Sequence, residues 1–131
     1  MKKFLVCLLA VLGLNSACGQ QDYGNTDVNG FAELVKDSNV VVLDVRTAEE
    51  FSEGHLARAI NIDIKQEDFM QQAKATLPTD KTIAVYCRSG RRSVNAAEKL
   101  SAEGYKLVNL QGGITAWTGA NMPVIKEPMS E

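Results

Sequence analysis

The sequence predicts a single α/β domain with a mainly parallel central sheet and helices on both faces. Three short runs rich in apolar and β-branched residues, at 40–43, 82–86 and 107–110, are typical of strands covered on both sides. Segments with the helical spacing of apolar residues alternate with these runs, which is the pattern of βαβ units. A chain of 131 residues has room for one ordinary domain.

The first half of the domain contains the weaker signals. The elements expected there are a short strand from Val28, a helix in 31–36, a strand over 40–43 and an alternating strand over 60–64. Thr47 and Glu50 have the spacing of a capping box, in which each side chain bonds the backbone N–H of the other residue. They predict a short helix that carries Phe51 and ends at Gly54.

The second half has clearer periodicity. Phe69, Ala73 and Leu77 lie on one face of a helix that must stop before Pro78. The elements expected after it are a strand over 82–86, a helix around 94–100 ending near Gly104, a strand over 107–110 and a short helix around 116–117.

Composition excludes several classes of protein. The formal net charge is −2 and only 6% of residues are aromatic. Nucleic-acid binding usually needs a basic face, and single-stranded binding also uses aromatic side chains on which bases stack. We therefore expect no nucleic-acid partner, and any anion must be bound by a local cluster of positive groups.

The first 17 residues are predicted to be a signal peptide. Two lysines precede an apolar run over residues 4–14, which is too short to span a bilayer. Ser16-Ala17-Cys18 resembles the lipobox of bacterial lipoproteins, although Asn15 occupies the place where that motif usually has leucine. We expect cleavage before Cys18, acylation of its thiol, and a flexible tether over 18–26 that leads to the domain. Cleavage without acylation is the alternative.

This processing implies an exported protein, anchored by lipid to a bacterial membrane and facing the periplasm or the outside. It leaves Cys87 as the only free thiol, because Cys7 is removed and Cys18 is acylated. A disulfide within the chain is then excluded. One cysteine and the single His55 cannot supply the usual ligands of a zinc site, so no metal is expected.

The chemistry concentrates in one loop, Cys87-Arg88-Ser89-Gly90-Arg91-Arg92-Ser93, between a predicted strand and a predicted helix. Ligands of α/β proteins bind at the carboxyl ends of such strands. A loop that curls into a helix can direct several N–H groups at one anion, and Gly90 permits the curl. These groups and the three arginines favour the thiolate of Cys87, which is the reactive form. The alternative is that Cys87 is a small buried hydrophobic residue.

Five segments resemble the rhodanese family of sulfurtransferases in order and spacing. They are Leu43-Asp44-Val45-Arg46, Glu53-Gly54-His55-Leu56, Ala59-Ile60-Asn61-Ile62, the Cys87–Ser93 loop, and Gly112-Gly113-Ile114-Thr115-Ala116-Trp117. The resemblance implies a single-domain, three-layer fold over residues 27–125 with a five-stranded parallel sheet, followed by a tail over 126–131. Arg58 and Asp63 depart from the family, which commonly has Gly and Pro there, and they place the local turn in doubt.

The resemblance implies transfer of a sulfane sulfur, from a small donor such as thiosulfate to a thiophilic acceptor, through a persulfide on Cys87. No cofactor is expected, and Gly112-Gly113 lacks the spacing of a nucleotide-binding fingerprint. Related phosphatases carry Cys-x5-Arg, whereas Arg92 is the fifth residue after Cys87. Phosphatase or arsenate-reductase chemistry is therefore the weaker reading. A sulfur carrier for an acceptor protein, or a rhodanese-like binding module, remains an alternative.

Several residues are expected to support this site. Arg88 and Arg92 are the candidates for steering an anionic donor, since guanidinium groups bind oxyanions through two bonds, while Arg91 could equally face solvent. Asp44 and Arg46 resemble a structural pair of the family that braces neighbouring loops, and Glu53 is a candidate partner for Arg46. We expect packing roles for His55 and Trp117.

Overall fold

The structure, a computed structural model, describes residues 23–126. The predicted signal peptide, Cys18 and most of the predicted C-terminal tail lie outside the described residues. Among residues 23–126, no helix has both the length and the hydropathy needed to cross a membrane.

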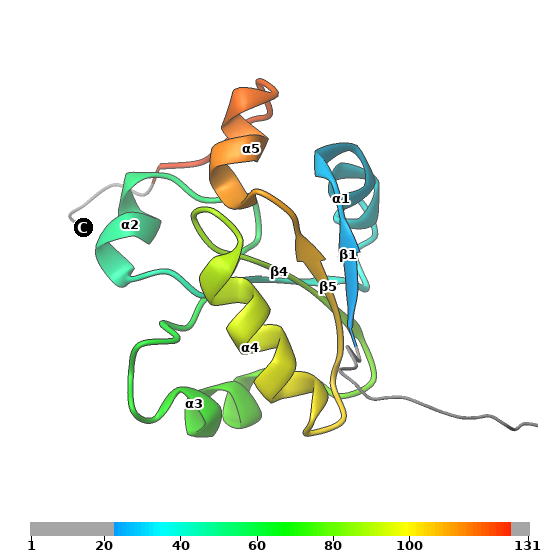
Figure 1. Cartoon of the computed structure of the whole chain (residues 1–131), viewed down its shortest axis with the longest axis vertical. Helices are drawn as coiled ribbons and strands as arrows, with labels where there is room; N and C mark the ends of the chain where they lie inside the picture. Colours follow the sequence, from blue (N-terminus) through cyan, green and yellow to red (C-terminus); the bar gives the residue numbers. More distant parts are fainter. Residues whose placement is uncertain (1–22, 127–131) are drawn as a thin grey trace, which may run out of the picture.

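Five parallel strands form one sheet in the order β1-β5-β4-β2-β3 (Figure 1). The strands are β1 (Gly24–Thr26), β2 (Val41–Asp44), β3 (Ile60–Asn61), β4 (Thr82–Tyr86) and β5 (Lys106–Leu110). The helices are α1 (Val28–Leu34), α2 (Ala48–Glu53), α3 (Phe69–Thr76), α4 (Arg91–Ser101) and α5 (Gly113–Gly119). Because β4 is the central strand, the loop after it emerges at the middle of the carboxyl edge of the sheet.

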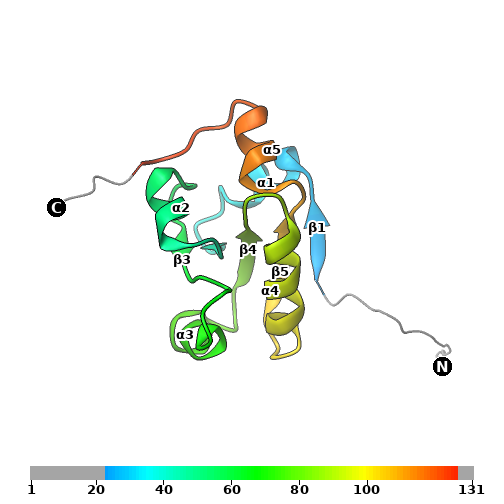
Figure 2. The ribbon, with the colours of Figure 1, turned by 60° about the vertical axis from the view of Figure 1, so that its left-hand side comes forward.

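Two apolar clusters cover the two faces of the sheet. The first joins α3 and α4 to the strands through residues such as Phe69, Ala97 and Leu100. The second joins α1 and α5 to the opposite face through Phe31 and Trp117. Figure 2 shows α4 running alongside the central strands β4 and β5. The predicted three-layer α/β fold, with helices on both faces of a five-stranded parallel sheet, is confirmed.

The amino-terminal edge differs from the prediction. Val28 begins α1 instead of a strand, and β1 lies at Gly24–Thr26, inside the segment predicted as a tether. Its residues pair with 108–110 of β5, and Tyr23 before it is only 9% exposed. The strand was missed because Gly-Asn-Thr has no alternation of apolar and polar residues; its pairing with β5 makes it a strand.

Helix α2 agrees with the prediction, whereas strand β3 is shorter than predicted. Thr47 and Glu50 form the predicted capping box, and Gly54 ends α2. The strand expected over 60–64 is shorter, because β3 contains only Ile60 and Asn61. Ile62 and Ile64 still donate backbone hydrogen bonds to the carbonyls of Asp44 and Val45, so the segment stays attached to the end of β2.

The turn at Arg58 keeps a conformation that glycine adopts most easily, with φ at 67°. Its guanidinium donates hydrogen bonds to the carbonyls of Val35 and Val40. The side chain therefore fastens this turn to the segment between α1 and β2.

Candidate active site

The Cys87 loop lies at the carboxyl end of the central strand. Cys87 follows β4 directly, and Gly90 is the N-cap of α4 with φ at 108°. The loop runs between β4 and α4 at the edge of the sheet (Figures 1 and 2). A positive φ at Gly90 turns the chain sharply from strand into helix, which is the curl predicted from the sequence.

The sulfur of Cys87 lies in a cradle of hydrogen-bond donors. The N–H of Gly90 donates to Sγ at 3.0 Å. The hydroxyl of Ser93 lies 3.4 Å from Sγ and 3.2 Å from the carbonyl of Gly90, and these two acceptors share its single proton. Burial alone raises the pKa of the Cys87 thiol, but hydrogen bonds from Ser93, Gly90 and Ser89 outweigh it, so the pKa lies below its ordinary value.

Cys87 is only 1% exposed, as a packing residue would be. A cysteine that only fills space needs no donors around its sulfur, however. The donors make this environment one that stabilises negative charge on sulfur, whether on a thiolate or on the outer sulfur of a persulfide.

The three arginines of the loop have different environments. Arg88 and Arg91 are exposed, and neither makes an ion pair within the described part of the chain. Arg92 is partly buried and binds Glu50 through both terminal nitrogens, at 2.8 and 2.9 Å. Glu50 thus engages both terminal nitrogens of Arg92, and the role of Arg92 toward an anionic donor stays a prediction. Arg88 and Arg91 remain available.

Glu50 is the site residue that the sequence analysis missed. It was interpreted only as the second member of the capping box with Thr47, and it does make those hydrogen bonds. Its bidentate bond to Arg92 holds the pKa of its carboxyl at about 2. Because Arg92 lies in the first turn of α4, the pair joins α2 to the reactive loop.

A buried ion pair lies at the carboxyl end of β2, the strand next to β4. Asp44 is fully buried and receives hydrogen bonds from Nε of Arg46 at 3.0 Å and from Nη2 at 2.7 Å. Nη2 of Arg46 also donates to the carbonyl of Gly54 at 2.6 Å. The expected partner Glu53 is exposed, so the carboxylate against Arg46 is Asp44. These contacts connect β2 to the end of α2, which is the bracing arrangement expected.

Tyr86 completes this buried layer. Its hydroxyl accepts the N–H of Leu56 at 3.1 Å, and the guanidinium of Arg46 lies 5.7 Å from the centre of its ring. Burial, together with the charge of Asp44, raises the pKa of Tyr86 well above its usual range. Tyr86 is therefore neutral at physiological pH and contributes packing and hydrogen bonding to the strand that carries Cys87.

His55 and Trp117 both pack against other aromatic side chains. The ring of His55 stacks on Phe51 with centroids 3.7 Å apart, and its Nδ1 lies 2.9 Å from the carbonyl of Phe51. Trp117 packs edge-on against Phe31 and donates from Nε1 to the carbonyl of Pro123 at 2.9 Å. These contacts are those of packing residues.

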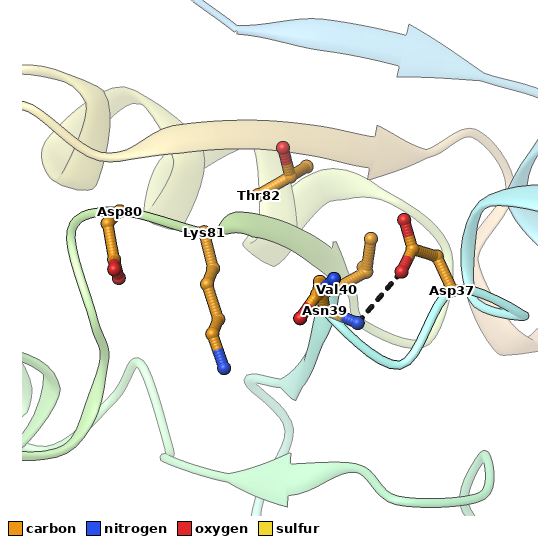
Figure 3. A pocket seen from close by; sticks show the side chains of 6 residues that line it. All are labelled: Asp37, Asn39, Val40, Asp80, Lys81 and Thr82. Atoms are coloured by element: carbon orange, nitrogen blue, oxygen red, sulfur yellow. Dashed lines mark hydrogen bonds between the residues drawn. The ribbon is translucent and has the colours of Figure 1, made fainter.

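A hollow of about 380 Å³ lies at the other end of the sheet (Figure 3). Its lining consists of Asp37, Asn39, Val40, Asp80, Lys81 and Thr82. These residues precede β2 and β4 or begin β4, whereas Cys87 follows β4, so the hollow is separate from the reactive loop. Between residues 23 and 126, His, Cys, Asp and Glu side chains form no group of three or more that could hold a metal ion.

A cysteine cradled by hydrogen-bond donors at the carboxyl end of the central strand defines a thiolate-stabilising, anion-binding kind of site. The sequence matches the family model of the Rhodanese-like domain over residues 27–120. The chain belongs to this family, as the resemblance implied.

Similar proteins of known sequence carry sulfurtransferase names. The chain is 38% identical to the putative sulfurtransferase YtwF of Bacillus subtilis over 91 residues, covering 70% of this chain and 85% of that protein. It is 33% identical to thiosulfate sulfurtransferase 18 of Arabidopsis thaliana over 126 residues, covering 87% and 92%.

A similar fold is found in a solved structure. The crystal structure of a rhodanese-related protein from Thermoplasma volcanium has a TM-score of 0.72 and 36% identity, and covers 80% of this chain and 100% of that chain. The chain is thus a rhodanese-like protein of the sulfurtransferase family.

Proposed function

We propose that this protein transfers a sulfane sulfur through a persulfide on Cys87. The observation that carries the proposal is the cradle around Sγ, in which the N–H of Gly90 and the hydroxyl of Ser93 both face the sulfur. Such donors stabilise the attacking thiolate and the terminal sulfur of the persulfide that follows.

In the first half-reaction the thiolate of Cys87 attacks the outer sulfur of thiosulfate. A new S–S bond forms between Sγ and that sulfur, the S–S bond of thiosulfate breaks, and sulfite leaves with the electron pair. No separate oxidant or reductant is consumed. Exposed Arg88 and Arg91 are placed to attract the anionic donor, which guanidinium groups bind well.

In the second half-reaction a thiophile such as cyanide, or the thiolate of an acceptor, attacks the outer sulfur of the persulfide. The sulfur leaves with the thiophile, and Sγ keeps the electron pair of the broken S–S bond as a thiolate. The cradle is ready for this leaving group because it stabilises the thiolate in the resting protein.

The position and the contacts of Arg92 argue against phosphate chemistry. A phosphatase loop needs a guanidinium free to bind the transferred phosphate. Arg92 is one place earlier than that motif requires, and both of its terminal nitrogens are bound by Glu50.

The test measures thiocyanate formed from thiosulfate and cyanide by the purified full chain, beside Cys87→Ser and the matched surface variant Ser101→Ala. Intact mass after incubation with thiosulfate alone detects one added sulfur. Turnover and added sulfur in wild type and Ser101→Ala, with neither in Cys87→Ser, is the expected result. Full turnover by Cys87→Ser would overturn the assignment of the nucleophile.

Two other outcomes have definite meanings. Added sulfur on Cys87 without turnover would favour a carrier that needs a specific acceptor protein. Neither added sulfur nor turnover would favour a rhodanese-like binding module.

We also propose that Cys18 carries a lipid that anchors the domain on the outer side of a bacterial membrane. The proposal is supported by the lipobox-like Ser16-Ala17-Cys18 after the apolar run. Cys18→Ala is expected to release the processed protein from membranes in a bacterial host, while Cys7→Ala is expected to leave it bound. Full retention of processed Cys18→Ala on membranes would contradict the anchor.

A further inference from the structure

The amino-terminal turn of α5 is bonded directly to the Cys87 loop. The N–H of Ile114 donates to the carbonyl of Cys87 at 2.9 Å, and the N–H of Thr115 donates to the carbonyl of Arg88 at 3.1 Å. The first N–H groups of a helix have no partner within the helix. In this protein two of them bind the reactive loop.

These bonds determine which way the peptide groups of the loop face. In a trans peptide the C=O and the following N–H point in opposite directions. When Thr115 holds the carbonyl of Arg88 on the α5 side, the N–H of Ser89 must face away from α5. Hydrogen bonding from that N–H is one of the causes that lower the pKa of the Cys87 thiol.

Gly113 permits this close contact. A Cβ at Gly113 would lie 2.4 Å from the carbonyl oxygen of Arg88 and 2.6 Å from that of Cys87. Both are backbone atoms of the loop, so neither can move aside as a flexible side chain would. Gly113 also has φ at 61°, which L side chains rarely adopt.

The loop also faces the turn of α5 at Gly90. A Cβ at Gly90, in the reactive loop, would lie 3.4 Å from the backbone nitrogen of Gly112, beside Gly113. That distance is an ordinary van der Waals contact, so Gly90 is favoured by its φ of 108°, whereas Gly113 is required by the contact as well. The contact has no counterpart at Gly119, at the other end of α5, where an added Cβ meets nothing within 4 Å.

We propose that the first turn of α5 is the positioning element of the sulfur site. Gly113 brings this turn against the loop, and the N–H groups of Ile114 and Thr115 hold the carbonyls of Cys87 and Arg88 toward α5, so that the N–H of Ser89 faces Sγ. The role of Gly113 is thus structural support of the thiolate cradle. The proposal deepens the proposed function, since it concerns the same reactive sulfur, but it can be tested without sulfur transfer.

The first test compares Gly113→Ala with two matched substitutions in the full chain. Gly119→Ala makes the same change in the same helix. Gly104→Ala makes it at φ 95° with no neighbour within 4 Å, which reproduces the backbone strain without the contact. Alkylation of Cys87 is followed against pH by mass spectrometry of its peptide, which separates it from Cys7 and Cys18, and thermal unfolding is measured on the same samples.

Gly113→Ala is expected to slow alkylation of Cys87 at neutral pH by about tenfold and to move the midpoint of its pH profile upward, because loss of N–H bonding lowers the thiolate fraction. Gly119→Ala and Gly104→Ala are expected to keep the wild-type midpoint, even where Gly104→Ala lowers the melting temperature. An unchanged midpoint in folded Gly113→Ala would overturn the proposal.

A second pair of variants tests one N–H donor without a substitution at Gly113. Thr115→Pro deletes the donor to Arg88, an N–H that has no partner within the helix, and places the ring Cδ beside the same carbonyl; the side chain of Thr115 is exposed. Thr115→Ala keeps the donor. Slower alkylation in Thr115→Pro, with the wild-type pH midpoint in Thr115→Ala, is expected; equal pH midpoints in the two variants would overturn the proposal even if Gly113→Ala does not fold.

These results are independent of whether the protein transfers sulfur. A shifted pH profile in Gly113→Ala, with no thiocyanate from wild type, would support the positioning role and contradict the proposed activity. Normal turnover in wild type, with an unshifted profile in both Gly113→Ala and Thr115→Pro, would support the activity and contradict the positioning role.

Discussion

Glu50 and Arg92 join α2 to the reactive loop through two parallel hydrogen bonds, one from each terminal nitrogen of the guanidinium to each oxygen of the carboxylate. The side chains are 23% and 22% exposed, so solvent screens the pair only in part. The charge of Arg92 acts on Cys87 as well as on Glu50. Glu50 therefore reduces the positive potential that the loop presents to an anion.

Glu50→Gln is expected to strengthen binding of an anionic donor. Without the carboxylate, Arg92 adds an uncompensated positive charge beside Cys87. The KM for thiosulfate should fall by about two- to fivefold at low ionic strength, corresponding to the roughly 0.5–1 kcal/mol of a partly exposed charge pair. Steady-state kinetics at low and high salt measure it. Glu49→Gln removes the same charge from the exposed neighbouring residue and should change KM less; a higher KM in Glu50→Gln would contradict this account.

The same pair should stabilise the fold in a pH-dependent way. The pKa of Glu50 is about 2 in the folded protein, below the ordinary value of 4.5. A lowered pKa gives stability that is fully present above the unfolded value and is lost as the pH falls from about 4.5 to about 2. Urea unfolding should show that Glu50→Gln is less stable than wild type by about 1–2 kcal/mol near neutral pH, after allowance for solvent screening. A difference that is equally large near pH 2 would exclude the charge of the Glu50 carboxylate as its source.

Ser93→Ala should weaken the thiolate directly. Ser93 is fully buried and its hydroxyl donates to Sγ, and a hydrogen bond to a charged group contributes roughly 1.5–3 kcal/mol. Alkylation of Cys87 near neutral pH should slow by about tenfold or more. Ser101→Ala is the matched change in the last turn of α4, where the hydroxyl bonds the carbonyl of Glu98. Equal alkylation rates in the two variants would show that the Ser93 hydroxyl does not act on the sulfur.

Arg46→Ala should damage the fold more than the chemistry. It would leave the carboxylate of Asp44 buried without its partner, which costs roughly 3–5 kcal/mol. Arg91→Ala, on the exposed surface, should change the free energy of unfolding by less than about 0.5 kcal/mol. Chemical denaturation measures both. A loss below about 1 kcal/mol in Arg46→Ala would mean that the pair does not brace the loops.

The parts of the fold that the sequence predicted correctly have local signals. Continuous apolar runs predicted β2, β4 and β5 to within about a residue, and the Thr47–Glu50 spacing predicted α2. β1 could not be predicted in this way, because its three polar or small residues become a strand only by pairing with β5, more than eighty positions away.

In the candidate site, too, the local features were predictable and the contacts between distant residues were not. The order strand, loop and helix placed Cys87 and its neighbours at the carboxyl end of β4, and that order is local. The Glu50–Arg92 pair is separated by 42 positions, and nothing in the sequence joins them. The Asp44–Arg46 pair did have a signal in the sequence, since residues two apart at a strand end lie on the same face of the sheet. This spacing points to Asp44, and not to Glu53, as the carboxylate partner of Arg46.

Arg58 provides a test of backbone strain in the turn after α2. Its φ of 67° is easy for glycine and strained for alanine, so Arg58→Gly should be more stable than Arg58→Ala by about 1 kcal/mol. Both variants lose the hydrogen bonds to Val35 and Val40, so their difference isolates the backbone. At exposed Lys99 in α4 the order should reverse, with alanine more stable than glycine by about 1 kcal/mol. Alanine above glycine at both positions would show that the Arg58 turn relaxes without a left-handed residue.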